Sequence, residues 1–231
     1  MKRLLTFFLA LLMAVLPLAA LAAGKLSVAQ ETFTVLPYLD YHAGFIFAEL
    51  QNTGDKPVAF NDALLELYDK EGNAIASNNY LNAYPEVLEP GETGYLFGYQ
   101  TVTDAATPDF IDDHLLTVTG RGSIDQQKIA LKTADARFET GDDPYWVEHL
   151  LLATVINETG ETLYDANVVF AVKDAEGKLM YAAAYLPYNV GLPAGSSLEL
   201  RVGVDAEAVK DWEAKGQTPA AVEAIAYTLT E

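Results

Sequence analysis

The sequence predicts an all-β protein: two tandem immunoglobulin-like β-sandwich domains after an N-terminal signal peptide. Three observations support this fold class. Apolar and polar residues alternate with the two-residue period of strands, turn signals rich in Gly, Asn and Asp separate the alternating segments, and the pattern occurs twice, 105 residues apart. A period this long indicates a duplicated domain, because solenoid repeats are only about 20–50 residues long.

Residues 1–22 have the features of a secretory signal peptide. Lys2 and Arg3 precede an unbroken apolar run, and Ala20 and Ala22 supply the small residues of a cleavage site. The apolar run is about long enough to span a bilayer, so an uncleaved membrane anchor is the alternative. We expect a secreted bacterial protein, extracellular or associated with the cell envelope, whose mature chain begins near Ala23.

The charge and the cysteine content restrict the classes of partner and site. The chain carries a net charge of −19 and contains no cysteine. A surface this acidic repels nucleic acid and anionic membranes, so we expect neither as a partner, and a membrane is contacted only through an uncleaved signal segment. Without cysteine there are no disulfides and no thiolate metal sites, so each domain depends on its apolar core.

The first domain is expected over residues 24–122 and the second over residues 133–231, with residues 123–132 as a linker or a terminal strand. Two pairs of equivalent strands show the alternation most clearly, and in each strand every second residue is apolar and faces inward. These inward residues are Ile46, Ala48 and Leu50, matched by Leu151, Ala153 and Val155, and then Ala63, Leu65 and Leu67, matched by Val168, Phe170 and Val172.

The strand that contains Leu65 and Leu67 and its equivalent with Phe170 and Val172 each end in a tight turn, "DKEG" and "DAEG" respectively. Asp at the first position and Gly at the fourth are typical of a type I turn, since the carboxylate accepts from turn amides and Gly tolerates the exit geometry. We therefore assign a structural role in these turns to Asp69, Gly72, Asp174 and Gly177, in preference to metal ligation or acid catalysis.

The remaining segments complete about seven short strands per domain, which is the composition of an immunoglobulin-like β-sandwich. The matched turns "LEPGET" and "LPAGSS" lead into strands at 94–99 and 198–204, and the closing strands are expected at 115–120 and 224–230. One helix is predicted over Asp205–Gly216, with Asp205 as its N-cap and Gly216 as its end. Residues 104–114 are its weaker counterpart in the first domain.

The segment "LLELYDKEG", together with Asn52-Thr53-Gly54 and "LEPGET", resembles the FxLYD domain, a bacterial extracellular module found alone or in tandem. The resemblance is clear over residues 40–100 and divergent over residues 145–200. Leu65 stands in place of the Phe that gives the family its name; Phe170 restores it in the second copy, where Val172 and Lys173 replace Leu and Tyr. The family implies an immunoglobulin-like fold and an extracellular location, and it has no established chemistry.

No motif indicates catalysis, so we expect no enzyme, no cofactor and no metal. The chain contains no nucleophile elbow, P-loop or dinucleotide fingerprint, and its three histidines lack the spacing of metal ligands. Two alternatives stay open: calcium held by acidic clusters, and hydrolysis by two facing carboxylates in an interdomain groove, which requires raised pKa values. The histidines are His42, His114 and His149, and the clusters contain Asp104, Asp112, Asp113, Asp142 and Asp143.

The thirteen tyrosines are the most informative excess in the composition. Aromatic side chains in the loops of a sandwich stack on sugar rings or anchor protein partners, whereas the alternative is that they fill the core. The candidate ligand-binding residues are Tyr80, Tyr84, Tyr185 and Tyr188. We expect a non-catalytic binding or interaction protein whose partner is an extracellular protein or a glycan. The alternatives are a carbohydrate or cell-wall binding module, a structural spacer, and the hydrolase described above.

Overall fold

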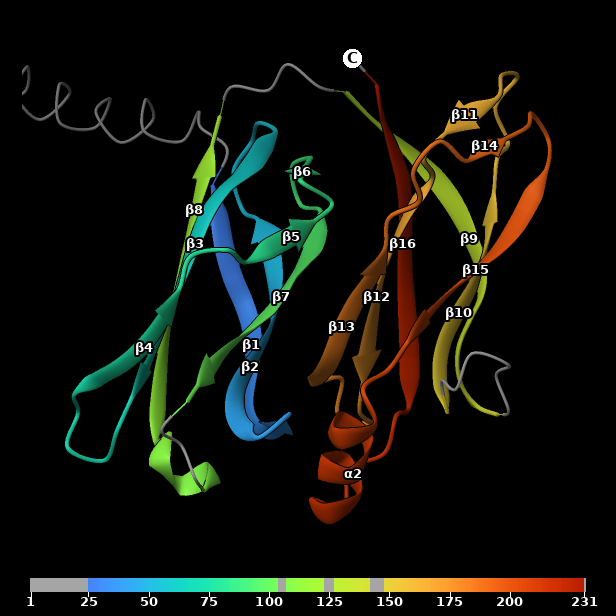
Figure 1. Ribbon diagram of the computed structural model, residues 1–231. Helices are drawn as coiled ribbons and strands as arrows, with labels where there is room; N and C mark the ends of the chain where they lie inside the picture. Colours follow the sequence, from blue (N-terminus) through green and yellow to red (C-terminus); the bar gives the residue numbers. More distant parts are fainter. Residues whose placement is uncertain (1–24, 104–106, 123–126, 142–147, 231) are drawn as a thin grey trace, which may run out of the picture.

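The described strands form two β-sandwiches that lie side by side (Figure 1). The computed structural model describes residues 25–103, 107–122, 127–141 and 148–230. The predicted signal peptide and the residues Asp104, Asp142 and Asp143 lie outside these ranges. Within them, no helix has the length and apolar character that crossing a membrane requires.

The first sandwich consists of two antiparallel sheets. One sheet has the order β1-β2-β7-β5, and in the other β3 is paired with β8 on one side and with β4 and β6 on the other. The strands are β1 (Leu26–Tyr38), β2 (Tyr41–Asn52), β3 (Val58–Tyr68), β4 (Ala74–Asn78), β5 (Asn82–Tyr84), β6 (Val87–Leu88), β7 (Thr93–Val102) and β8 (Asp113–Arg121).

The second sandwich has one continuous strand order, β13-β12-β16-β9-β10-β15, with a small β11-β14 pair beside it. Strand β9 belongs to both layers, because residues 127–131 pair with β16 and residues 132–140 pair with β10. Residues 127–132, expected to be a linker or a terminal strand, are thus the first part of β9. The strands are β9 (Gln127–Thr140), β10 (His149–Ile156), β11 (Leu163–Tyr164), β12 (Asn167–Lys173), β13 (Leu179–Tyr185), β14 (Gly191–Leu192), β15 (Ser197–Gly203) and β16 (Ala221–Thr230).

The predicted strand faces are confirmed in both sandwiches, and so is the all-β fold. All twelve residues predicted to face inward are buried, six in the core of each sandwich. The predicted helix is α2 (Ala206–Ala214), whose N-cap Asp205 accepts a hydrogen bond from the Glu207 amide at 2.8 Å. The expected counterpart in the first domain is only the 3-10 turn η1 (Pro108–Phe110).

The two matched hairpin turns have the same hydrogen bonds from backbone amides. The Asp69 carboxylate accepts from the backbone amides of Glu71 and Asn73 at 3.0 and 2.8 Å and from the Asn73 side-chain amide at 3.0 Å. These bonds, the one from the Asn73 side chain above all, hold the pKa of Asp69 below its ordinary value. Gly72 has a φ of +80°, a conformation that residues with a Cβ resist. Asp174 accepts from the amides of Glu176 and Lys178 in the same way, and Gly177 has a φ of +78°.

A buried asparagine joins the "N-T-G" and "L-x-P-G-E-T" segments of the first domain. Asn52 is completely buried, and its side-chain amide donates to the carbonyls of Lys56 and Leu88 at 2.8 and 2.9 Å while its oxygen accepts from the Gly54 amide at 3.0 Å. Asn157 repeats this arrangement with the carbonyls of Glu161 and Leu192. The motif therefore has a structural cause, since a buried amide must satisfy its polar atoms locally.

The two sandwiches also pack against each other, through the outer face of the β1-β2-β7-β5 sheet and the outer face of β13-β12-β16. Phe47 and Tyr95 of the first domain form a buried apolar cluster with residues of β12 and β13. The Phe47 ring lies 4.8 Å from that of Tyr181. The domains thus use unlike faces, because β10, the equivalent of β2, lies in the opposite layer. The residues of the second domain in this cluster are Val169, Ala171, Leu179 and Ala182.

Candidate functional site

The four tyrosines predicted to bind a ligand lie in very different environments. Tyr80, between β4 and β5, and Tyr188, between β13 and β14, are almost fully exposed, at 85% and 84%. Tyr185 is 40% exposed near the end of β13. Tyr84 instead packs against Phe97 and the interdomain cluster, and burial, together with the charge of Glu86, raises its pKa. Only Tyr80 and Tyr188 are thus presented fully to solvent.

Tyr80 lies beside a recess of about 500 Å³ at the edge of the first domain. The recess forms where the chain crosses from β4 in one sheet to β5 in the other. Strand β5 covers only residues 95–97 of β7, so that the following residues of β7 form the wall of the recess. The lining consists of Asn78, Tyr80, Asn82, Phe97, Gly98, Tyr99, Gln100 and Thr101.

The crossing segment is held by the side chain of Asn78. Its amide donates to the Tyr99 carbonyl at 2.7 Å, and its oxygen accepts from the Tyr80 backbone amide at 2.7 Å. These two bonds attach the loop that carries Tyr80 to the uncovered edge of β7. The position of Tyr80 is therefore fixed by its own backbone, although its ring is free to contact a ligand.

A second group of aromatic rings adjoins the recess through Tyr99. The Tyr99 ring lies 4.7 Å from that of Tyr38 and 5.2 Å from that of Phe45, both distances measured between ring centroids. The two tyrosine hydroxyls are 2.8 Å apart, and this hydrogen bond, with some burial, raises the pKa of Tyr99. The rings support one another, so one wall of the recess is pre-organised.

The recess combines the two kinds of group that recognise a sugar. Tyr80 and Tyr99 offer apolar ring surface, and three amide side chains line the recess, those of Asn78, Asn82 and Gln100. Asn78 and Gln100 already bond to backbone groups, so Asn82 is the amide that offers a ligand both a donor and an acceptor. The Asn82 side chain has no hydrogen-bond partner among the described residues, and it is solvent-exposed. Among the residues that the structure describes, no carboxylate or cationic side chain lines the recess, so their chemistry suits a neutral polyhydroxylated ligand.

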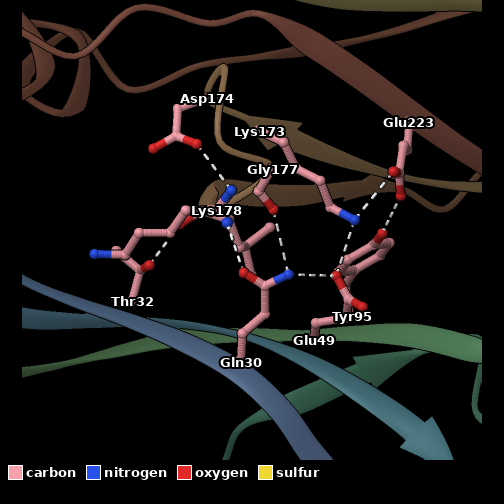
Figure 2. A network of polar contacts seen from close by, with 10 residues as sticks. Gln30, Thr32, Glu49, Tyr95, Lys173, Asp174, Gly177, Lys178 and Glu223 are labelled. Atoms are coloured by element: carbon pink, nitrogen blue, oxygen red, sulfur yellow. Dashed lines mark hydrogen bonds and ion pairs between the residues drawn. The ribbon is translucent and has the colours of Figure 1, made fainter.

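Two acids do face each other between the domains, but a lysine lies between them (Figure 2). The Lys173 ammonium is 2.9 Å from Glu49 of the first domain and 3.0 Å from Glu223 of its own domain. The Tyr95 hydroxyl donates to Glu223 at 2.5 Å. Gln30 and Thr32 extend the network, because both bond to the backbone of Leu179 in the hairpin that follows Lys173.

The electrostatics of this network are those of a structural clamp. Partial burial by itself raises the pKa of Glu223, but the hydrogen bonds from Tyr95 and Lys173 and the charge of Lys173 outweigh burial, so its pKa lies below the ordinary value. Burial and the hydrogen bond to Glu223 raise the pKa of Tyr95. A general acid in a glycosidase needs a raised pKa, and Glu223 has the opposite shift.

The histidines and the remaining acids form no metal site in the described ranges. No group of three or more His, Asp or Glu side chains there is arranged to hold an ion. His114 stacks on Phe33, with its Nε2 3.3 Å from Glu31. His149 lies 3.2 Å from the Thr140 hydroxyl, and His42 lies in β2. Asp113 accepts a hydrogen bond from the backbone amide of His114.

Comparison with known proteins gives no family for this chain. No protein-family profile and no curated protein matches it. One similar solved structure is the C-terminal globular domain of an oligosaccharyltransferase from Pyrococcus abyssi, with a TM-score of 0.24 and 8% identity over 90% of this chain. Another is a structure of infectious bursal disease virus, Gt strain, with a TM-score of 0.14 and 10% identity, covering 90% of this chain and 70% of the viral chain. The chain spans 48% of the first of these, and TM-scores this low have no bearing on what it binds.

Sequence reasoning identified Tyr80 but missed the residues that surround it. Asn78 and Asn82 flank Tyr80 in "SNNYLNAY", so a local excess of asparagine beside an aromatic residue was the available signal. Tyr99 and Gln100 come from a strand twenty residues away. Their contribution depends on how far β5 covers β7, which the sequence pattern does not reveal.

Proposed function

We propose that this protein is a non-catalytic, secreted binding protein and that the recess beside Tyr80 binds a carbohydrate. The observation that carries the proposal is a tyrosine 85% exposed beside a recess lined by three amide side chains. Exposed aromatic rings with adjacent amides are the surface that a sugar requires.

The location is part of the same proposal. The apolar N-terminal run with its small-residue end supports secretion. The resemblance of Leu65–Gly72 to the FxLYD signature supports a bacterial extracellular module, and the confirmed sandwich fold is compatible with it. An extracellular glycan or cell-wall polymer is then the class of ligand that the protein meets.

The alternatives receive less support from the geometry. A structural spacer needs neither an aromatic recess nor a tyrosine held outward by Asn78. A hydrolase acting through the interdomain acids needs a raised carboxyl pKa and room for substrate, whereas Lys173 and the apolar cluster occupy the space between Glu49 and Glu223. An extracellular protein partner stays as the second candidate, because Tyr80 would serve equally well as its anchor.

A glycan array and cell-wall fractions probed with residues 23–231, with and without calcium, test the proposal. We expect calcium-independent binding that Tyr80→Ala weakens about tenfold, which corresponds to one good aromatic contact of about 1.4 kcal/mol. Asn82→Ala should weaken it by about two- to tenfold, the effect of losing one exposed hydrogen bond.

Tyr188→Ala is the matched control, since Tyr188 is equally exposed but does not line the recess. Equal loss of binding in both tyrosine variants would locate binding outside the recess and refute the site. Absence of any glycan binding would refute the carbohydrate assignment and favour a protein partner.

A further inference from the structure

A second cavity, of about 450 Å³, lies in the other domain beneath helix α2. Its walls come from three segments: the end of β9 with the start of β10, helix α2, and the chain that leads from α2 to β16. The first domain has only the turn η1 at the position of α2. The cavity therefore belongs to the structure that distinguishes the second domain from the first.

The floor of this cavity is apolar and aromatic. Trp212 and Val209 of α2 are 4% and 8% exposed and form its inner part. The Phe138 ring meets Trp212 edge-on at 6.2 Å, and His149 stacks on the other side of Phe138 at 5.7 Å with an angle of 13° between the rings. These contacts fix the rings in place, so the cavity is pre-formed for an apolar group.

The rim of the cavity is negatively charged. Glu148 and Glu213 line it, and within the described part of the chain neither side chain makes a hydrogen bond or a close ion pair. Lys210 also lines it, but its ammonium is bound to Glu207 at 2.6 Å. That bond does most to raise the pKa of Lys210, and Glu148 adds a weaker contribution.

The end of α2 adds to this negative potential. Glu213, Gln217 and Thr218 lie at or just after the C-terminal end of the helix, where the partial charge of the helix dipole is negative and favours a cation. The carboxylates of Glu148 and Glu213, taken with the Lys210–Glu207 pair, leave a net charge of about −2 on these four side chains. The other polar side chains that line the cavity, Thr140 and His149, already contact each other at 3.2 Å.

We infer that this cavity binds a small organic cation, an ammonium group attached to an apolar body, with the apolar part on Phe138 and the ammonium at Glu213 and Glu148. Both parts are required, because the aromatic floor alone does not select for charge and the rim carboxylates alone are an ordinary solvated surface. Such a group occurs in free amines and in lysine side chains of peptides. This site is independent of the recess beside Tyr80, whose described lining residues carry no charge.

Calorimetric titration of the full mature chain tests the inference with three probes: 2-phenylethylamine, its neutral counterpart 2-phenylethanol, and a blocked Phe-Lys dipeptide. We expect at least one ammonium probe to bind with a Kd of about 1 mM or below, which is typical for a ligand of this size. The neutral alcohol should bind at least several-fold more weakly. The stronger of the two ammonium probes identifies whether free amines or peptides are the source of the ligand.

Variants distinguish binding in this cavity from non-specific attraction of a cation to an acidic protein. Glu213→Gln should weaken ammonium binding roughly two- to fivefold, the usual range for one solvent-exposed ion pair. Thr218→Trp, which fills the mouth without changing charge, should abolish binding. Glu161→Gln removes the same charge from the loop between β10 and β11, and β11 lies at the opposite end of the domain from α2 (Figure 1), so this variant should bind as the parent does. Circular dichroism melting curves check that each variant is folded.

Two results would overturn the inference. One is that the protein binds the alcohol as tightly as the amine, or that Glu213→Gln binds the amine as tightly as the parent does, since the carboxylates would then have no role. The other is an unchanged Trp212 indole N–H resonance on titration with every probe, because a ligand on Phe138 must shift a ring that touches it.

Discussion

Replacing Lys173 by Met should loosen the contact between the two domains in a way that depends on pH. The Lys173 side chain is 14% exposed, and its single charge is shared by Glu49 and Glu223, whose side chains are 16% and 48% exposed. Each carboxylate lies within 3.0 Å of the same ammonium, so the two repel each other by up to about 3 kcal/mol at an effective dielectric constant of 20. Removing one partner of a fully buried pair costs about 3–5 kcal/mol, and the exposure of Glu223 reduces our expectation to about 2–3 kcal/mol.

The pH dependence identifies the cause. In the parent, the lowered pKa of Glu223 stabilises the fold above the ordinary glutamate pKa, and this contribution is lost as pH falls through the lowered value. In the variant, an uncompensated neighbouring carboxylate raises the pKa of Glu223, so protonation relieves the repulsion. The difference in stability between parent and variant is therefore largest at pH 7 and shrinks below about pH 5.

Thermal unfolding followed by circular dichroism at pH 7 and pH 4.5 measures this difference. We expect Lys173→Met to lower Tm by about 5–10 °C at pH 7 and by clearly less at pH 4.5. Lys132→Met is the control, because the Lys132–Glu158 pair at 2.7 Å is more than half exposed at both ends, and its loss should cost less than about 1 kcal/mol. A Lys173→Met variant that melts like the control, or that shows the same deficit at both pH values, would refute the clamp.

Three further predictions concern the folds of the domains. Leu67→Asp puts a charge at a completely buried position and should unfold the first domain at a cost of several kcal/mol, whereas Tyr68→Ser in the same strand should cost much less. If the two variants unfold at the same urea concentration, the strand register is wrong. Asn52→Ala removes four hydrogen bonds to buried or half-buried backbone groups and should cost about 3–4 kcal/mol of unfolding free energy. The control is Asn61→Ala at an exposed position, and equal urea midpoints of the two variants would contradict a structural role for Asn52. Burial raises the pKa values of Tyr95 and Tyr227 far above 10, so the folded state favours their neutral forms and stability should fall as pH rises above about 10, the ordinary tyrosine pKa. The double variant Tyr95→Phe, Tyr227→Phe should lose less stability than the parent between pH 9 and pH 11. An equal loss in both proteins would show that these two tyrosines do not cause the alkaline destabilisation.

The internal arrangement of each domain could be predicted because short-range chemistry determines it. Alternation fixed which residues of β2, β3, β10 and β12 face the cores, and the Asp and Gly of each hairpin fixed the turns. The buried pair Asn52 and Asn157 was visible as an identity between the two copies. That each asparagine connects two sequence motifs within its own domain is seen only from the hydrogen bonds of its side chain.

The contact between the domains was not predicted, although the sequence contains a signal for it. Phe45 and Phe47 alternate with the inward residues of β2, and Val169 and Ala171 do the same in β12, so both strands are apolar on both faces. Strands buried on both faces read as nearly continuous apolar runs. The partner of such a face cannot be inferred from local pattern, and neither can the recess, which depends on the length of β5.

The packing of unlike faces has a consequence for assembly. A head-to-tail contact between repeated units can continue indefinitely, because each added unit offers the next a copy of the surface it has just covered. Here the outward-facing counterparts of the contact residues are charged: the register aligns Tyr95 with Glu199 and Phe97 with Arg201 on one outer face, and Ala171 with Glu66 on the other. Charges at these positions disfavour a repeat of the same apolar contact on either outer face of the pair.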